Sequence, residues 1–380
     1  MTIIKIDSMK FNLRVFIVLL ALCPAIALIS SCGTSVNVPH TETVTQVYGS
    51  PFDGAPQIFS RYLPSSGIAE DSKIKFQTSS TEKGLKVMNY HFESLFGSPQ
   101  DISVIEINPR MYRFNVANHV KLVRTSEIAS EAGAVAAMNG TFYDMKKGGS
   151  VCYLQIDGVV ADTTKGKDMK VRANGAVVIK KGKLSVEPWN ADKESIYKER
   201  FLKGLNRIGY PEETRHSESV NAVRSGYGSG VIRSQKNVSI MATMPLLIKD
   251  GYAVELPYYK GFSDKRHPRS VVFEKDGKIC LMVIDGRSKG NAAGMTLDEV
   301  QRYLLSMDGG KGCQNAVNLD GGGSSTLWLK PSSGEKYSNG AIAPEASIQG
   351  TGVINHPSDN GKFDHKGERR VANSIIVLRK

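Results

Sequence analysis

Short apolar runs with a period of two dominate the chain from about residue 84 onward. Residues 102–107 are apolar on both faces, as in a strand that is covered on both sides, while residues 112–116 alternate between apolar and polar as a half-buried strand does. The same pattern predicts further strands at 134–138, 151–160, 175–186, 244–248, 253–256, 270–273, 279–284, 316–319 and 374–378. Asp157-Gly158, Lys181-Gly182 and Asp276-Gly277 are typical of tight hairpin turns between such strands.

Helical patterns are fewer. A short helix is expected at 126–132, and Thr296 with Glu299 forms a capping box that opens a helix over 297–307. Residues 188–230 are polar and weakly patterned, which indicates an insertion or long loop, partly helical around 193–205. The pattern therefore predicts an α+β fold of large mixed or antiparallel sheets with a few flanking helices, in a single domain over 84–380.

The N-terminus has the pattern of an export signal. Lys10 and Arg14 precede an apolar stretch over 15–29, which is too short and too interrupted by proline to favour a membrane span. The stretch ends in Leu-Ile-Ser-Ser-Cys-Gly, which resembles a bacterial lipobox with Cys32 as the lipid-modified residue; an ordinary signal sequence with an incidental cysteine is the alternative. We expect a lipoprotein signal peptide at 1–31, a tether and N-terminal extension at 32–83, and a lipid-anchored protein of the bacterial cell envelope.

Composition narrows the possible partners. The 380 residues are 41% hydrophobic, as in a soluble globular protein, and carry a net charge of +12. That charge is compatible with nucleic acid, an anionic surface or a phosphate-bearing substrate. The lysines are scattered and no nucleic-acid-binding motif is present, so we expect no nucleic-acid partner. Outside the export segment, Cys152, Cys280 and Cys313 lack the spacing of a zinc site and are expected to be buried apolar residues.

Polar groups with chemical potential follow or precede four of the apolar runs: Asn139, Arg269, Asp285 and Asp320. Side chains at the ends of core strands are held rigidly and can face a common edge of a sheet. Each position also has a plain structural explanation, as a turn residue or a solvated charge. Only their combination favours a site.

The stretch over 315–328, Asn-Ala-Val-Asn-Leu-Asp-Gly-Gly-Gly-Ser-Ser-Thr-Leu-Trp, is the most informative segment. In it, Asp320 is followed by three glycines and then by three residues with hydroxyl groups. Glycines allow close approach to the backbone, and successive amide N–H groups can bind an anion. A flexible turn is the alternative interpretation.

Several motifs, in this order, resemble the phosphodiester glycosidase family, whose best-known activity removes a covering N-acetylglucosamine from mannose 6-phosphate. The resemblance spans roughly residues 84–380. It rests on the motifs at residues 137–142 (AMNGTF), 172–176 (RANGA), 268–270 (PRS), 283–287 (VIDGR), 294–296 (GMT), 318–326 (NLDGGGSST) and 367–373 (GERRVAN). Thr141 stands where the family often has glycine, and the insertion over 188–230 departs from the family pattern.

The resemblance implies hydrolysis of a glycosyl-1-phosphodiester, without a cofactor or metal, in a phosphorylated glycan or exopolysaccharide. Asp320 and Asp285 would be the catalytic carboxylates, with Asp320 the nucleophile or water-activating base. The implied phosphate contacts are Arg269, Arg287, Gly321, Gly322, Gly323 and Ser324. Asn139 and Asn318 would bind sugar hydroxyls or orient Asp320, although a buried role in stabilising a turn is the alternative for both.

Two other classes of function stay open. A metal-dependent phosphodiesterase that cuts the P–O bond would need clustered His and Asp ligands, and the seven histidines show no HxH or HxxxH spacing. A lipoprotein that binds phosphorylated glycans without catalysis would need the arginines and glycines but neither Asp285 nor Asp320. The identity of the sugar, the stereochemical outcome and the membrane leaflet do not follow from the sequence.

Overall fold

The computed structural model describes residues 44–49, 56–61, 73–82, 84–207, 237–307, 312–331 and 352–380. Every strand pair in these ranges is antiparallel. The strands are β1 (Val44–Gly49), β2 (Pro56–Arg61), β3 (Lys73–Glu82), β4 (Leu85–Leu95), β5 (Ser98–Ile107), β6 (Tyr112–Arg124), β7 (Ala136–Asn139), β8 (Leu154–Ile156), β9 (Val159–Asp162), β10 (Gly175–Lys180), β11 (Lys183–Pro188), β12 (Val238–Thr243), β13 (Leu246–Lys249), β14 (Tyr252–Val254), β15 (Arg269–Lys275), β16 (Lys278–Ile284), β17 (Cys313–Asn318), β18 (Leu327–Leu329) and β19 (Arg370–Arg379). The helices are α3 (Thr125–Glu131), α4 (Lys167–Arg172), α5 (Ala191–Arg207), α7 (Leu297–Ser306) and the 3-10 turn η3 (Gly322–Ser324). The predicted α+β class is confirmed.

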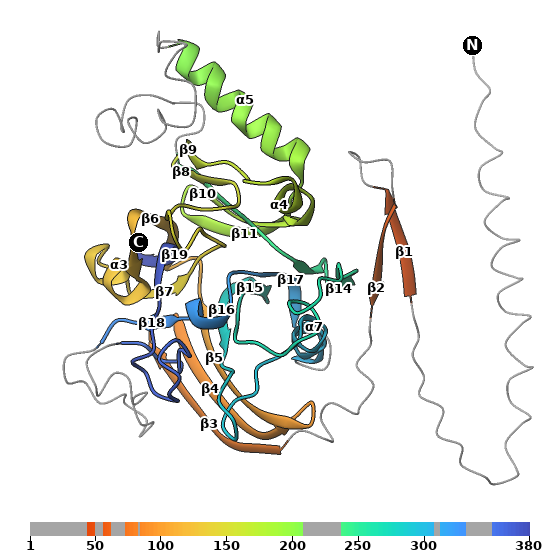
Figure 1. Ribbon diagram of the computed structural model, residues 1–380, viewed down its shortest axis with the longest axis vertical. Coiled ribbons are helices and arrows are strands. Elements are labelled where there is room, and N and C mark those ends of the chain that lie inside the picture. The colour runs from red at the N-terminus through yellow and green to blue at the C-terminus, as the bar shows by residue number, and fades with distance from the viewer. Residues whose placement is uncertain are drawn as a thin grey trace, which may run out of the picture. The chain divides into compact units, whose positions relative to one another are not determined.

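Three sheets make up the fold (Figure 1). The ten-stranded sheet has the order β1-β2-β14-β13-β17-β15-β16-β5-β4-β3, the five-stranded sheet β11-β10-β12-β8-β9, and the four-stranded sheet β18-β7-β19-β6. Neighbouring strands in each sheet are often far apart in sequence. As a result, segments from both halves of the chain meet at the sheet edges.

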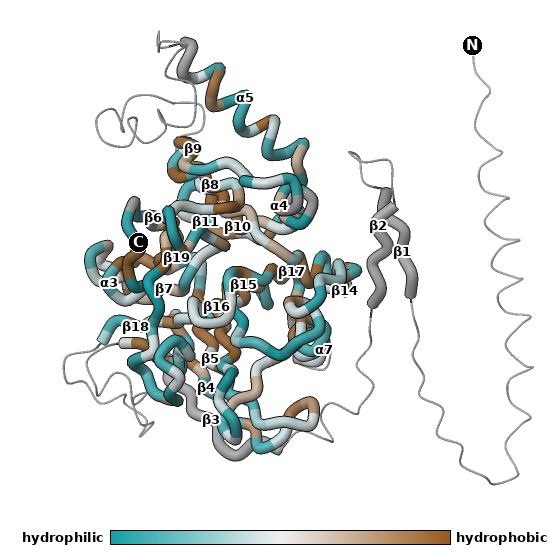
Figure 2. The backbone as a smooth tube through the Cα atoms, viewed as in Figure 1, coloured by the Kyte–Doolittle hydropathy of each residue, from teal (hydrophilic) through white to brown (hydrophobic). Residues whose placement is uncertain are grey.

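The main core lies where apolar faces of all three sheets meet, and includes Leu281 from β16, Val177 from β10 and Ile375 from β19. A second core packs Val300 and Leu304 of α7 against the ten-stranded sheet. The hydropathy colouring shows brown, apolar strands inside and teal connections outside (Figure 2). Burial of the alternating apolar positions accounts for the period of two in the sequence.

Aromatic stacking attaches α5 to the five-stranded sheet. Trp189 stacks on Tyr153 with ring centroids 5.3 Å apart, and Tyr197 of the helix stacks on Trp189 at 5.9 Å. Phe201 of α5 is buried in the same cluster. The helix predicted around 193–205 is therefore present, while residues 208–230 of the predicted insertion lie outside the described residues.

Local sequence signals correspond closely to the structure. In all three predicted hairpin turns, a non-glycine residue with positive φ precedes a glycine with positive φ: Asp157, Lys181 and Asp276 have φ of 48°, 51° and 47°. The capping box of α7 is formed, since Thr296 Oγ1 accepts a hydrogen bond from the N–H of Glu299 at 3.1 Å and Glu299 Oε2 accepts one from the N–H of Thr296 at 2.9 Å.

Some elements were not predicted. β12 and β18 are short strands that tertiary pairing holds, β12 with β10 and β18 with β7. In the predicted N-terminal extension, β3 pairs along β4. The predicted signal segment and Cys32 lie outside the described residues.

Cys152, Cys280 and Cys313 are buried, as expected, and all three are free thiols. Among the described residues, none of the helices is both long enough and apolar enough to cross a membrane.

Candidate active site

The ends of four strands from two sheets meet around Asp320. β15 begins at Arg269 opposite the end of β16 at Ile284, and Val271 pairs with Asn318 at the end of β17. The N–H of Asp320 donates to the carbonyl of Gly140, which follows β7, at 3.2 Å. The polar residues that follow these strands therefore share one edge of the fold, as their positions in the sequence indicated.

Asp320 is a partly exposed carboxylate with a raised pKa. Burial raises its pKa to about 6, and the Ser324 hydroxyl, Arg369, the N–H of Gly321 and Arg287 oppose this shift. Two guanidinium groups thus act on one carboxylate. A carboxylate with a strongly perturbed pKa that solvent reaches, next to two cations, is a candidate for the reacting group.

Asn139 fixes the backbone of Asp320. Its side-chain oxygen accepts hydrogen bonds from Ser270 Oγ at 2.8 Å and from the N–H of Thr326 at 3.1 Å, and its Nδ2 donates to the carbonyl of Asp320 at 2.7 Å. The side chain is fully buried. Of the two roles considered from the sequence, this geometry favours orienting Asp320 over contacting a sugar.

Asn318 has a similar structural position. Its Nδ2 donates to the carbonyls of Met244 at 2.9 Å and Leu319 at 2.7 Å. The side chain is fully buried, and its Oδ1 has no hydrogen-bond partner among the described residues. Like Asn139, Asn318 holds the backbone next to Asp320 through a hydrogen bond to a carbonyl group.

Asp285 is buried beneath the site rather than exposed in it. Its side chain is 1% exposed, Oδ1 accepts from Asn355 Nδ2 at 2.8 Å, and Oδ2 accepts from the N–H of His356 at 2.8 Å. His356 Nδ1 lies 3.2 Å from the same Oδ2. Because both oxygens are engaged inside the protein, the arrangement favours positioning over the catalytic role predicted for Asp285 from the sequence.

The Asp285 network reaches the glycine loop. Asn355 Nδ2 also donates to the carbonyl of Ser325 at 3.1 Å, and Asn355 Oδ1 accepts from the N–H of Leu327 at 2.8 Å. A change at Asp285 would therefore be transmitted to the segment that follows Ser324.

His356 lies between two carboxylates, Asp285 at 3.2 Å and Asp101 at 3.8 Å. Burial lowers its pKa, but the interactions with Asp101 and Asp285 outweigh burial and raise the pKa to about 10. The ligand atoms of these three residues lie within 4.8 Å of one another, close enough to hold a metal ion. A metal would have to displace the proton that the two carboxylates stabilise on His356.

The glycine loop is a tight turn that uses most of its own amides. The N–H of Gly322 donates to the carbonyl of Pro268 at 2.9 Å, and those of Ser324 and Ser325 donate to Gly321 and Gly322 at 3.3 Å. The N–H of Gly321 interacts with the carboxylate of Asp320. Only the N–H of Gly323, among the four predicted phosphate-binding positions 321–324, is without a bond inside the described residues. The sequence did not reveal that these backbone N–H groups are bonded within the protein.

Glycine is nevertheless required in this loop. A Cβ on Gly321 would lie 2.6 Å from the carbonyl oxygen of Pro268, and Gly322 has a φ of +64° with Arg287 Nη2 2.8 Å from its Cβ position. A Cβ on Gly323 would lie 2.5 Å from Arg369 Nη2. Two arginines therefore cover the turn directly, and any larger residue would displace them.

Ser324 adds an available hydroxyl. Its side chain is 1% exposed, and Oγ has no hydrogen-bond partner of normal geometry among the described residues. The hydroxyl lowers the pKa of both Asp320 and Tyr143, so it faces both groups. A buried hydroxyl without a full set of bonds, beside a carboxylate with a raised pKa, is suited to a bound ligand.

The two arginines predicted from the sequence differ. Arg269 is 1% exposed, and it donates from Nε to Met295 at 2.9 Å and from Nη2 to Phe262 and Lys265 at 2.7 and 3.0 Å, all to backbone carbonyls. Burial, followed by Arg287, lowers its pKa to about 10. Three of its five donors are used, which leaves Nη1 for the predicted phosphate contact.

Arg287 is exposed and has a φ of +63°. A non-glycine residue in the left-handed region is strained and is often found at functional sites. This backbone conformation, together with the neighbouring Gly322, places the guanidinium over the turn.

Two residues at the site were not predicted as site residues. Arg369 Nε donates to Asp359 Oδ1 at 2.8 Å while its charge acts on Asp320, and Tyr143 donates to the carbonyl of Arg370 at 2.9 Å. Arg369 belongs to the Gly-Glu-Arg motif on which the family resemblance partly rests, and this motif was the signal that could have identified it.

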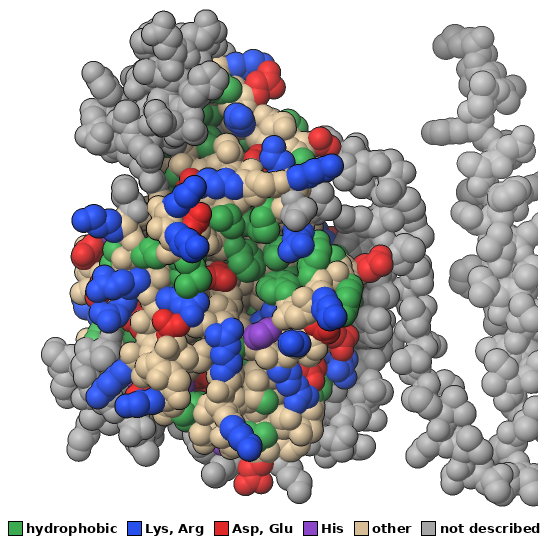
Figure 3. Space-filling view, viewed as in Figure 1, with side chains coloured by type: hydrophobic (Ala, Val, Ile, Leu, Met, Phe, Trp, Pro, Cys, Tyr) green, Lys and Arg blue, Asp and Glu red, His purple; other side chains and the backbone are tan. Residues whose placement is uncertain are grey.

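Figure 3 shows one face of the molecule, on which Lys and Arg side chains surround a mostly hydrophobic stretch.

A family model covers the part of the chain that contains these residues. The model described as phosphodiester glycosidase matches residues 132–378, which include Tyr143, Asp320 and Arg369. A curated protein from Bacillus subtilis (strain 168), the SPbeta prophage-derived uncharacterized protein YomE, is 32% identical over 96 residues. That alignment covers 25% of this chain and 14% of YomE.

Solved structures with a similar arrangement have low sequence identity. The catalytic domain of zebrafish N-acetylglucosamine-1-phosphodiester alpha-N-acetylglucosaminidase, auto-inhibited by its pro-peptide, is 17% identical, with a TM-score of 0.49 over 90% of this chain and 89% of that one. A hypothetical protein from Synechocystis is 14% identical, with a TM-score of 0.47 over 78% and 62%. The protein BPSS2145 from Burkholderia pseudomallei K96243 is 14% identical, with a TM-score of 0.45 over 74% of each chain.

Proposed function

Because the chain belongs to the phosphodiester glycosidase family, we propose that it hydrolyses the bond between sugar and phosphate in a glycosyl-1-phosphodiester. The proposed substrate resembles an N-acetylglucosamine-1-phosphodiester in a glycan or exopolysaccharide. The observation that carries the proposal is Asp320, a partly buried residue whose carboxylate is acted on by both Arg287 and Arg369. One site thus combines a group for the sugar carbon with cations for the phosphate.

Asp320 acts on the anomeric carbon, as a nucleophile or as the base that activates water. Either role requires the ionised form, and a pKa of about 6 leaves most of the carboxylate ionised at neutral pH. Overall, water supplies an oxygen to the anomeric carbon, the C–O bond to phosphate breaks, and the phosphate departs as a monoester with the electron pair of that bond.

The leaving group accounts for the arginines. A phosphate monoester has a second pKa of about 6 and departs without strong protonation. Arg287 and Arg369 stabilise the negative charge that develops on it, and the Ser324 hydroxyl and the N–H of Gly323 provide two further donors. In this scheme Asp285 positions the loop through Asn355 and does not touch the substrate.

Hydrolysis in ¹⁸O-labelled water tests the reaction type. With an N-acetylglucosamine-1-phosphodiester as substrate, mass spectrometry of the products should show the label in the sugar. Label in the phosphate would instead indicate P–O cleavage by a phosphodiesterase, for which the cluster of Asp101, Asp285 and His356 is the candidate metal site. Tight binding of several such substrates without product would indicate a glycan-binding protein.

The location of the protein is a separate proposal that rests on the sequence. We infer that residues 1–31 direct export and that Cys32 carries a lipid that tethers the protein to the bacterial envelope. Metabolic labelling with a clickable fatty acid should mark the wild type and leave Cys32→Ala unlabelled, with Cys23→Ala as the matched control. Equal labelling of wild type and Cys32→Ala would contradict the anchor.

A further inference from the structure

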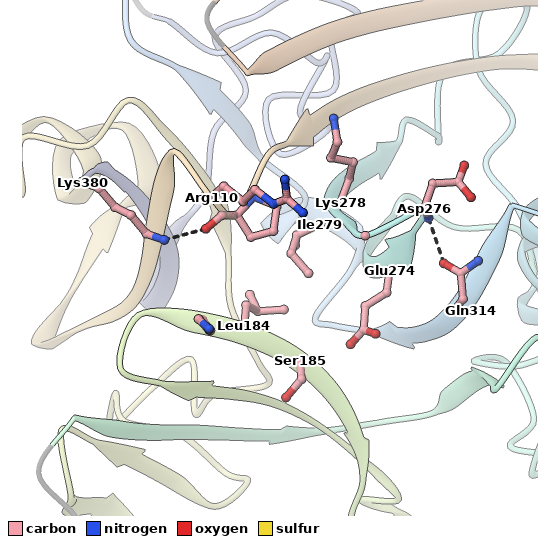
Figure 4. A pocket seen from close by; sticks show the side chains of 12 residues that line it. Arg110, Leu184, Ser185, Glu274, Asp276, Lys278, Ile279, Gln314 and Lys380 are labelled. Carbon is pink, nitrogen blue, oxygen red and sulfur yellow. Dashed lines mark hydrogen bonds between the residues drawn. The ribbon is translucent and has the colours of Figure 1, made fainter.

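A cavity lies at the opposite end of β15 from Asp320. It has a volume of about 780 Å³ and is lined by the β15–β16 hairpin turn, the turn before β6, the start of β11 and Lys380 (Figure 4). β15 runs from Arg269 beside the candidate active site to Lys275 beside this cavity. Six steps along a strand span about 20 Å, so the cavity is separate from the active site.

Cations dominate the cavity. Arg110, Lys183, Lys278 and Lys380 line it, against the carboxylates of Glu274 and Asp276. No ion pair of Arg110 or Lys183 is formed among the described residues, and Lys278 has only a 3.7 Å contact with Glu106. Unneutralised cations around a cavity of this size favour an anionic ligand.

The walls of the cavity are held in place. Glu274 accepts hydrogen bonds from the N–H of Val186 at 2.6 Å and from Asn315 Nδ2 at 2.8 Å, which ties β15 to β11 and β17. Lys380 Nζ donates to the carbonyl of Pro109 at 2.7 Å, as Figure 4 shows. A cavity that is formed before a ligand arrives avoids the cost of ordering its walls on binding.

The rest of the lining suits a sugar. Leu184 and Ile279, which are mostly buried in the core, contribute apolar atoms to the lining, and Ser185 and Gln314 contribute polar ones. A sugar ring has an apolar face and hydroxyl groups at its edge, so it can use both. The volume lies within the range of about 300–1,000 Å³ that is usual for ligand pockets.

We propose that this cavity, which we call the distal pocket, binds a sugar unit bearing a phosphate or carboxylate group. The inference deepens the proposed function, because a glycan bound in the distal pocket would be retained while the site around Asp320 acts elsewhere on it. Arg110, Lys183 and Lys278 contact the anionic group, and Leu184 and Ile279 contact the ring. Binding in this pocket does not depend on catalysis.

The test is calorimetric titration of the full chain with two probes, a mannan fragment that carries phosphate monoesters and a polygalacturonate fragment that carries carboxylates. Arg110→Glu/Lys183→Glu should weaken binding of the preferred fragment at least tenfold. The matched control is Arg200→Glu/Lys198→Glu on α5, which makes the same charge change at exposed positions outside the pocket and should bind as the wild type does. The fragment that binds more tightly identifies the anionic group.

Hydrolysis of a small N-acetylglucosamine-1-phosphodiester, measured in parallel, separates the two proposals. It should be unchanged in both double variants, since neither alters the candidate active site. Equal affinity of the pocket variant and the wild type, or equal weakening in the control, would overturn the distal pocket. Absence of hydrolysis by every form would count against the proposed function while the titration still decides the pocket.

Discussion

Replacing Asp320 with asparagine should stabilise the folded protein at neutral pH while removing its activity. The pKa of Asp320 is about 6 in the folded state against 3.8 in the unfolded chain, with burial as the main cause. The difference of about 2 pH units corresponds to about 3 kcal/mol. Above pH 6 the folded protein holds a carboxylate whose burial is unfavourable, and Asp320→Asn removes that charge without changing the shape of the side chain.

The sign follows from proton binding. Between pH 3.8 and 6 the folded state binds the proton and the unfolded state does not, so this group destabilises the wild type progressively as the pH rises through that window. The gain in Asp320→Asn should therefore reach up to about 3 kcal/mol at pH 7.5 and vanish near pH 3.8. Turnover of the phosphodiester should fall by about 10³-fold or more.

Urea unfolding at pH 7.5 and pH 4, followed by circular dichroism, measures the effect. Asp276→Asn is the control: it removes an exposed carboxylate in an Asp-Gly turn that asparagine also favours, and should change stability by less than about 0.5 kcal/mol. If Asp320→Asn is no more stable than the wild type at pH 7.5, or if its gain is the same at pH 4, burial of this carboxylate is not the cause of its raised pKa.

Three further predictions concern the surroundings of Asp320. Arg287→Gln should lower kcat for the phosphodiester by about 10²–10³-fold and have a much smaller effect on an aryl glycoside of the same sugar, which has no phosphate; an equal loss on both substrates would remove the assigned role. His356→Gln should cost about 3 kcal/mol in urea unfolding at pH 7 because it removes the cation that lies between the buried carboxylates of Asp101 and Asp285. The folded pKa of His356 is about 10 against 6.5 in the unfolded chain, so its contribution is complete below pH 6.5 and lost as the pH rises through 10; a variant whose deficit is the same at pH 7 and pH 10.5 would contradict this pairing. Gly322→Ala should reduce kcat at least tenfold because its Cβ would meet Arg287, whereas Gly277→Ala, with a similar φ of +70° and no atom within 4 Å, should cost only stability; equal kinetic losses in the two variants would contradict the clash.

The elements of the fold were largely predictable because their signals are local. The continuous apolar runs in β5, β15 and β16 reflect burial of both faces of these strands, and the Asp276-Gly277 turn depends on two adjacent residues. β12 and β18 are defined mainly by the strands they pair with. Their sequences alone therefore carried little information about their conformation.

In the candidate site, too, some features were predictable from neighbouring residues and others depend on residues far away in sequence. The position of Asp320 after β17 follows from adjacent residues. The need for glycine at 321–323 does not, because Pro268, Arg287 and Arg369 approach these positions from distant segments. The burial of Asp285 does not, because Asn355 and His356 surround it from 70 and 71 residues away in sequence. Arg369 and Tyr143 act on Asp320 from 49 and 177 residues away in sequence. The sequence indicated which chemistry is present and only partly which side chains face the substrate.

The hydrogen bonds of Asn139 have a consequence for folding kinetics. This one amide joins segments that are 131, 181 and 187 residues apart, through Ser270, Asp320 and Thr326. Contacts between such distant residues form slowly, because long loops must close before any of them is made. Enzymatic competence should therefore be acquired late in folding, so that the return of activity after dilution from denaturant follows the slowest folding phase.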